Sequence, residues 1–162
     1  MTDLVYQNYT TTTSTSFSIP DLTDLSFTVT SWNIPGVTTG SPRQPTMFTD
    51  IPLRGDKLVY EPLVVEFIVT EDLANWLSVH DWLVGITAPF KASQFANKRI
   101  EYADGTVTIY SSHNNKLKAV SFKNMVPVSL SELQFVTTDT ETTYLKATAT
   151  FMFERFEIIT ES

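Results

Sequence analysis

The chain contains no cysteine among its 162 residues. This absence excludes disulfide bonds, thiolate nucleophiles and cysteine-based metal sites. It fits a cytoplasmic protein, and it is also compatible with an assembly that later works outside a cell. Long hydrophobic runs are missing too. The sequence contains no run of about eighteen apolar residues, which a membrane-spanning helix would need. It also lacks a basic start followed by an apolar segment, which would indicate a secretory signal. We therefore expect no contact with a membrane.

Basic residues are scarce. Lys and Arg number 11 against 18 Asp and Glu, which gives a formal net charge of −7. Binding nucleic acid by neutralising its phosphates needs clusters of Lys and Arg, so the composition argues against such binding. An acidic wall would repel phosphate and would suit a conduit through which DNA slides without sticking. Solubility alone is the simpler explanation of the charge.

Residue combinations that carry catalysis are missing as well. His80 lies beside Asp81 in a predicted helix, where adjacent residues do not face each other. Its place on an apolar stripe favours a packed histidine, and His113 lies in a predicted turn. There is no pair of His residues at ligand spacing, no calcium-binding loop, no Gly-rich phosphate loop and no nucleophile elbow. We predict a protein that is not an enzyme and holds no cofactor or metal.

What the chain does have is the length and apolar content of one globular domain, with 42% hydrophobic and 12% aromatic residues. Residues 1–16 end in the polar tract YTTTTSTS. This tract has too few apolar residues to pack, so it predicts a flexible Thr-rich arm. We assign residues 17–162 to a single β domain.

Strand patterns dominate that domain. Leu25–Trp32 alternates apolar and polar residues with a period of two. Lys57–Thr70 is apolar on both faces, so both faces need cover. Further strands are expected at Thr106–Ser111, Leu117–Val126, Leu133–Thr137 and Tyr144–Ile159, with turns at Pro20–Asp21, Asp104–Gly105, His113–Lys116, Pro127–Ser131 and Thr138–Thr142, and a bulge near Glu154.

Proline and glycine interrupt the pattern between residues 33 and 56. Prolines occur at 35, 42, 45 and 52, and glycines at 36, 40 and 55. This density excludes a regular helix. A loop of this length inside a compact domain is usually functional, or it finds its place only with a partner.

The pattern of residues 71–84 predicts a helix, the one strong helix signal in the sequence. Thr70 is a suitable N-cap, and acidic residues follow it at the positive end of the helix dipole. The apolar stripe consists of Leu73, Trp76, Leu77, His80, Leu83 and Val84. Trp82 lies on another side of the helix from Trp76, so a subunit interface or a second patch of the domain's own core must cover it. The fold class is mainly β: a sandwich or partly closed barrel of two packed antiparallel sheets with one flanking helix.

Three motifs occur in order along residues 17–157. A strand leads into Asn33-Ile34-Pro35-Gly36-Val37. Arg54-Gly55-Asp56 precedes a long strand, an acidic turn and a helix that ends in His80-Asp81-Trp82. Pro127–Phe156 contains a Pro link, the segment Glu132-Leu133-Gln134, a polar turn and a long final strand. In these respects the chain resembles the tail tube proteins of contractile-tailed bacteriophages, which are related in fold to the type VI secretion tube protein. The Thr-rich arm departs from the family's pattern.

The resemblance implies a structural virion protein that is assembled in the host cytoplasm. Six copies would form a ring, with their sheets joined into one β-barrel around a lumen. The rings would stack into a tube that contacts sheath and baseplate proteins and passes DNA without binding it specifically. Contacts between subunits or rings are then expected at Pro35, Gly36, Gly40, Pro42, Arg43, Pro45, Met47, Phe48 and Trp82.

Two other roles stay open from the sequence. The first is a baseplate tube initiator or a tail terminator of the same fold, which forms one or two rings and does not polymerise. The second is a β-sandwich module that binds a carbohydrate or a peptide. Such a module needs an exposed aromatic platform, for which Tyr102, Tyr110 and Trp32 are the candidates.

Overall fold

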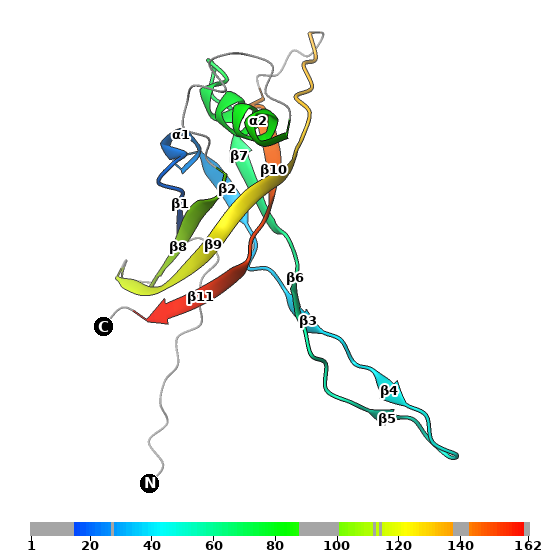
Figure 1. The fold of residues 1–162 in the computed structure, drawn as a ribbon. Helices are drawn as coiled ribbons and strands as arrows, with labels where there is room; N and C mark the ends of the chain where they lie inside the picture. The colour runs from blue at the N-terminus through cyan, green and yellow to red at the C-terminus, as the bar shows by residue number, and fades with distance from the viewer. Residues whose placement is uncertain are drawn as a thin grey trace.

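The computed structural model of the chain describes residues 15–26, 28–87, 101–111, 113, 115–137 and 143–160 (Figure 1). Its strands are β1 (Thr15–Ser18), β2 (Val29–Trp32), β3 (Val37–Thr39), β4 (Arg43–Gln44), β5 (Ile51–Pro52), β6 (Leu58–Tyr60), β7 (Leu63–Ile68), β8 (Ala103–Tyr110), β9 (Lys116–Leu130), β10 (Lys146–Met152) and β11 (Arg155–Thr160). The helices are α1 (Thr23–Ser26) and α2 (Ala74–Thr87). The predicted mainly β fold class is confirmed.

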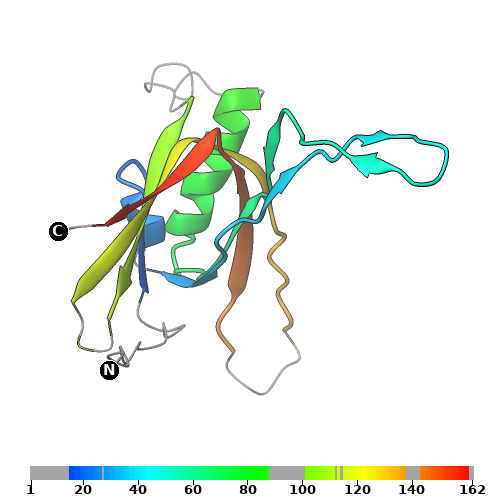
Figure 2. The same ribbon diagram turned by 90° about the horizontal axis from the view of Figure 1, so that it is seen from below.

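One long strand organises the body. The strands pair antiparallel in the order β1-β8-β9-β10-β7-β2, and β11 also pairs with β9. On one side β9 pairs with β8. On its other side Lys118–Lys123 pairs with β11 and Val126–Leu130 pairs with β10. The strand β9 therefore belongs to two packed sheets at once, and α2 lies beside them (Figure 2).

The core follows from the period of two in the strands. Leu63, Val65 and Phe67 of β7 are fully buried, and β10 contributes Ala149 and Phe151 opposite them. Both strands lie within the predicted strands Lys57–Thr70 and Tyr144–Ile159. Full burial of an aliphatic or aromatic side chain contributes about 1.5–3 kcal/mol each, so this face of the sheet anchors the fold. The outward face of β7 is less covered than its apolar pattern suggests, since Val64 is exposed.

The predicted strand Leu25–Trp32 is wrong in its first half. Residues Thr23–Ser26 form α1, and only Val29–Trp32 is a strand. The Leu25 carbonyl accepts hydrogen bonds from both the backbone N–H and the hydroxyl of Thr28, at 3.1 and 3.0 Å. Leu25 is fully buried all the same, because a single helical turn places it in the core as well as a strand would.

Two predicted turns are parts of strands. Asp104 and Gly105 lie within β8, where the register with β9 shifts. A Cβ on Gly105 would lie 2.5 Å from the Met125 sulfur, so this glycine permits a close approach of two strands and not a turn. Pro127 lies within β9 opposite Phe151, where the register with β10 also shifts, and a bulge tolerates proline there.

Other boundaries differ from the predictions more simply. Lys57–Thr70 breaks at Glu61-Pro62 into β6 and β7, and Leu133–Thr137 contains no strand. At the bulge predicted near Glu154, β10 ends and β11 begins. The Glu154 N–H there donates a hydrogen bond to the Lys123 carbonyl at 3.0 Å. The turns at Pro20–Asp21 and around His113 are confirmed. The predicted turn Thr138–Thr142 lies outside the described residues.

The helix begins later and faces differently than predicted. It starts at Ala74, whose N–H is capped by the Asp72 carboxylate at 3.1 Å. Its buried residues are Asn75, Val79, Trp82 and Gly85, whereas Leu77 of the predicted stripe is exposed. Polar contacts of Asn75 with Thr28, Ile68 and Thr70 select this face. In the predicted N-terminal arm, Thr15 and Ser16 belong to β1, and residues 1–14 lie outside the described part of the chain.

Candidate assembly surfaces

Residues 33–60 form an arm that leaves the body of the protein (Figures 1 and 2). The predicted loop is a hairpin-like pair of ladders, with β3 paired to β6 and β4 to β5. Backbone hydrogen bonds from Leu53 N to Pro42 O at 2.8 Å and from Glu61 N to Gly36 O at 2.9 Å extend the pairing. Proline and glycine therefore shorten the strands of the arm without preventing them.

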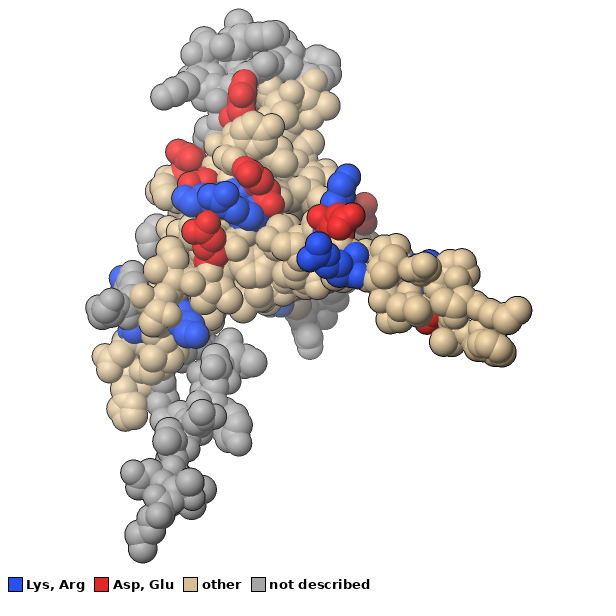
Figure 3. Space-filling view, turned by 60° about the horizontal axis from the view of Figure 1, so that its bottom comes forward, with Lys and Arg blue, Asp and Glu red and all other residues tan. Residues whose placement is uncertain are grey.

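The tip of the arm is apolar and almost fully exposed. Met47 is 90% exposed and Phe48 is 94% exposed. The Thr46 hydroxyl accepts a hydrogen bond from the Thr49 N–H at 3.2 Å and donates to its carbonyl, which closes the turn. Figure 3 shows that the outer end of the arm carries almost no charge. Two large side chains in this position need cover from another surface.

The base of the arm is held by aromatic packing. The Tyr60 ring at the end of β6 lies 5.5 Å from both Phe153 and Phe156, and these rings also contact Phe122 of the core. Aromatic pairs in tilted or edge-on geometry contribute about 0.5–1.5 kcal/mol each beyond burial. The direction of the arm is thus set by the corner between β10 and β11.

Most of the predicted contact residues lie on this arm. The exposed ones are Gly36, Gly40, Pro42, Arg43, Pro45, Met47 and Phe48. Pro35 is buried at the base, so it cannot offer an exposed contact. The expected contact at Trp82 is corrected in the same way. This side chain is only 6% exposed, and its ring packs 6.0 Å from that of Phe151. The domain's own core covers Trp82, and no subunit interface is needed for it.

A second candidate surface is the edge strand β11. Among the described residues it pairs only with β9, and Ile158 and Ile159 are 54% and 47% exposed. Its charged residues, Arg155 and Glu157, lie at its start and pair with each other at 3.1 Å. An edge strand with two exposed isoleucines side by side is open to pairing with another strand.

Some charged groups of the body form pairs at its surface, where Lys or Arg lie beside Asp or Glu (Figure 3). Lys123 donates to Asp104 at 2.6 Å and Lys146 to Glu66 at 2.9 Å. These hydrogen bonds are the main cause of the lowered pKa of the Asp104 and Glu66 carboxyls. Such pairs tie neighbouring strands together, and none forms a nucleophile–base arrangement.

The histidine expectations hold only in part. The His80 ring stacks on Trp76 at 5.2 Å, as expected for a packed histidine. It also lies 3.3 Å from the Asp81 carboxylate, although adjacent helical residues were not expected to face each other. Within the described part of the chain no group of three His, Cys, Asp or Glu residues could hold a metal ion. In the same ranges no helix is long and apolar enough to cross a membrane.

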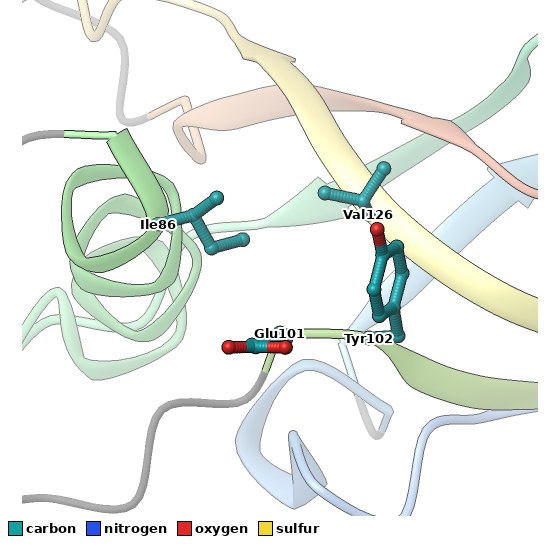
Figure 4. Close-up of a pocket in the computed structure, with 4 residues that line it drawn as sticks. All are labelled: Ile86, Glu101, Tyr102 and Val126. Atoms are coloured by element: carbon teal, nitrogen blue, oxygen red, sulfur yellow. The ribbon is translucent and has the colours of Figure 1, made fainter.

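A hollow of about 210 Å³ lies between α2 and the start of β8 (Figure 4). Ile86, Val126, Tyr102 and Glu101 line it. Among the described residues of the lining, only the Glu101 carboxylate and the Tyr102 hydroxyl are polar, and two such groups do not define a ligand site.

The proposed aromatic platform is not assembled. Tyr102 precedes β8 and Tyr110 ends it, so they lie at opposite ends of the strand. The Trp32 indole is half-buried and donates to Thr15, and the Tyr110 hydroxyl lies 3.2 Å from the Ser16 hydroxyl. The structure therefore does not bring together the flat surface that a carbohydrate module requires.

The fold is that of the tube-type proteins of contractile injection systems. The chain superposes on the tube-terminating cap of the anti-feeding prophage with a TM-score of 0.70, at 16% identity, over 98% of this chain and 96% of that one. It superposes on the sheath/tube terminator of the PVC extracellular contractile injection system with a TM-score of 0.64, at 12% identity, over 95% and 99% of the two chains. At these identities the likeness concerns the fold alone.

One protein with a similar sequence is also a component of a phage tail tube. Over 103 residues, or 61% of its length, the chain is 30% identical to the tail tube terminator protein of Enterobacteria phage T4. It spans 56% of that relative's length, or about half. No protein-family model matches the chain. The relative and both structures are terminators or caps of tubes, which is the role that the sequence analysis gave as its alternative to a tube subunit.

Proposed function

We propose that this protein is the terminator of a contractile phage tail tube: a structural subunit that closes the end of the tube as a homohexameric ring in the virion. The 30% identity with a tail tube terminator carries this proposal. The agreement in fold with a tube-terminating cap over 98% of the chain supports it. The tube subunit predicted first is the second candidate.

The physical features of the chain suit a ring. The open edge of β11 and the apolar tip of the arm both need cover, and copies arranged around an axis cover such surfaces without leaving free edges. The net charge of −7 suits a passage for DNA that does not retain it. In this role the protein contacts the tube and sheath of the tail and performs no catalysis.

The arm supplies a contact between copies in this proposal. Its exposed residues 36–53 are rich in Pro, Gly and apolar side chains, and they contribute nothing to the core of their own chain. Deletion of residues 40–50 should therefore leave a folded monomer that no longer assembles. Circular dichroism would check the fold, and light scattering would check the assembly.

Electron microscopy of the purified protein at high concentration tests the role. A terminator should give discrete rings that do not lengthen, and these rings should bind to one end of preformed tubes and stop their growth. Long tubes formed by the protein alone would replace the terminator with the tube subunit. A monomer at every concentration, with no effect on tube growth, would overturn both.

A further inference from the structure

The arm and the solvent side of α2 complement each other in charge and apolar character, although they lie at opposite ends of the body (Figure 1). We infer that the arm of one copy seats on the solvent side of α2 and on the segment after β9 in a second copy. Each copy then gives one arm and receives another. This inference rests on the proposed ring and specifies which surfaces build it.

The arm presents an apolar end between two cations. Met47 and Phe48 form its tip, and Ile51 and Leu53 behind them are 48% and 45% exposed. Arg43 and Arg54 stand on either side of this stretch, and Asp50 is the one acidic residue between them. The arm therefore suits a partner surface that is apolar at its centre and acidic at its rim.

The receiving face has that character. It comprises Glu71, Asp72, Leu77, Asp81, Glu132 and Phe135. Leu77 is 43% exposed and Phe135 is 65% exposed, and the four acidic residues are exposed as well. Residues 70–87 and 131–137 contain no Lys or Arg. A surface with this composition attracts the arm's arginines and offers its phenylalanine an apolar contact.

Hydrogen bonds hold the two parts of the receiving face together. The Trp76 indole on α2 donates to the Ser131 carbonyl at 3.3 Å. Ser131 is in turn fixed to β10, since its N–H donates to the Thr148 carbonyl at 2.8 Å and its hydroxyl accepts from the Thr148 N–H at 2.9 Å. The segment that carries Glu132 and Phe135 is therefore anchored beside α2 before any partner arrives.

The contact must form between copies. Packing of Tyr60 on Phe153 and Phe156 fixes the base of the arm, and both ribbon views show the arm running away from α2 (Figures 1 and 2). A contact between two different patches of the same protein is head-to-tail, and such contacts close into a ring when the rotation between copies closes. This geometry is the one that a terminating ring needs.

A pair of introduced cysteines tests the contact directly, because the chain has no cysteine of its own. Phe48→Cys with Leu77→Cys in one chain should give a disulfide-linked ladder that ends at the size of the ring. Mixing the two single variants should give dimers only. Phe48→Cys with Leu117→Cys, a leucine of β9 that is exposed to nearly the same extent as Leu77, is the matched control and should give no ladder. Equal cross-linking of the two pairs would overturn the contact.

A charge exchange tests the electrostatic part. Arg43→Glu with Arg54→Glu should lower the association constant by about tenfold or more, because the pairs become repulsive. Adding Glu71→Lys and Asp81→Lys in the same chain should restore assembly. Lys116→Glu with Lys118→Glu makes the same change of charge on exposed residues of β9 and should leave assembly unchanged. Sedimentation velocity measures all four proteins.

The results separate this inference from the proposed function. Rings that form and cap tubes without the Phe48–Leu77 cross-link, and without rescue by charge exchange, overturn the contact and leave the terminator role standing. The cross-link together with rescue, in tubes that lengthen, supports the contact and overturns the terminator. A protein that stays monomeric overturns both.

Discussion

The indole Nε1 of Trp32 on β2 donates a hydrogen bond of 3.1 Å to the hydroxyl of Thr15 on β1. These two strands are the ends of the strand path that runs from β1 through β9 to β2. Trp32 also packs against the buried core. A side-chain bond therefore bridges the two ends where no backbone ladder between β1 and β2 exists in the described residues, and the barrel is partly closed.

This bridge predicts a coupled loss of stability. Trp32→Phe keeps an aromatic ring in place and removes the donor, and Thr15→Val removes the acceptor with little change in shape. We expect each change to lower the free energy of unfolding by about 1 kcal/mol. The double variant should lose less than the sum, because the bond can be lost only once. Urea denaturation of the four proteins measures this, and strict additivity would contradict the bridge.

Gly55 predicts a defect confined to the arm. A Cβ at Gly55 would lie 1.9 Å from the Gly40 carbonyl oxygen and 2.4 Å from the Thr39 hydroxyl. Gly55→Ala must therefore push apart the two sides of the arm. Gly40→Ala is the matched control, since nothing lies within 4 Å of its added carbon. We expect faster tryptic cleavage at Arg43 and Arg54 in Gly55→Ala alone.

The stability of the body should barely differ between these two glycine variants, since the arm adds no side chain before Tyr60 to the core clusters. Urea midpoints within experimental error of each other would fit this expectation. Equal cleavage of the two variants would show that the arm does not need the close approach at Gly55.

Alternation made much of the body predictable from the sequence. Leu63, Val65 and Phe67 recur at every second position, and this period alone assigns them to the core face of β7. The Pro- and Gly-rich stretch at 33–56 was predictable as an interruption of the regular strand pattern. The two strand pairs of the arm could not be predicted from the sequence. Their strands have only two or three residues, and polar and apolar side chains are equally exposed there, so no periodic pattern arises.

The errors arose where particular hydrogen bonds or close contacts outweigh the period of the sequence. Leu25 alternates as a strand residue would, yet turn hydrogen bonds to Leu22 and from Thr28 place it in the core by a helical turn. Asp104–Gly105 has the composition of a turn, but its glycine serves the close approach of Met125. For Trp82 the decisive fact is which side of α2 faces inward, and a buried polar residue in the first turn of the helix decides it.

That polar residue, Asn75, predicts a large loss of stability on substitution. Its side chain is fully buried. Its amide donates to the Thr28 hydroxyl at 2.9 Å and to the Ile68 carbonyl at 2.7 Å, and its oxygen accepts from the Thr70 N–H at 3.2 Å. Asn75→Ala removes three hydrogen bonds from these partly buried groups at once, so we expect a loss of about 2–4 kcal/mol in the free energy of unfolding.

Ser78→Ala is the control for Asn75, because it lies on the same helix and loses one local bond, from its hydroxyl to the Ala74 carbonyl at 2.8 Å. We expect a change of no more than about 0.5 kcal/mol for it, since that carbonyl keeps its helical partner. Denaturation by urea, followed by tryptophan fluorescence, compares the two variants. Equal effects would mean that Asn75 does not organise the start of α2.

The carboxyl of Asp104 makes stability depend on acidity in a defined direction. The hydrogen bond from Lys123 at 2.6 Å, followed by that from the Asn124 N–H at 3.1 Å, holds the pKa of Asp104 below its ordinary value of 3.8. Asn124 stands with φ at 52°, in the left-handed region that asparagine tolerates better than most residues. The carboxylate therefore supports an unusual backbone position in the middle of β9.

A lowered pKa in the folded state means that the unfolded chain binds the proton more readily. The stabilisation is complete above pH 3.8, and it is lost as the pH falls through the lower value of the folded protein. Asp104→Asn should thus be less stable than the natural chain near neutral pH, and the difference should shrink well below pH 3.8. The effect should be small, because the side chain of Asp104 is 51% exposed.

Lys123→Met removes the main cause of the shift and should give the same flattened pH profile, whereas Asp50→Asn on the arm should follow the natural chain. Urea midpoints across an acid series would record all four profiles. A gap between the natural chain and Asp104→Asn that stays constant from neutral to acidic pH would show that the Lys123 and Asn124 contacts do not favour the charged carboxylate. In that case Asn124 would hold its place by backbone pairing alone.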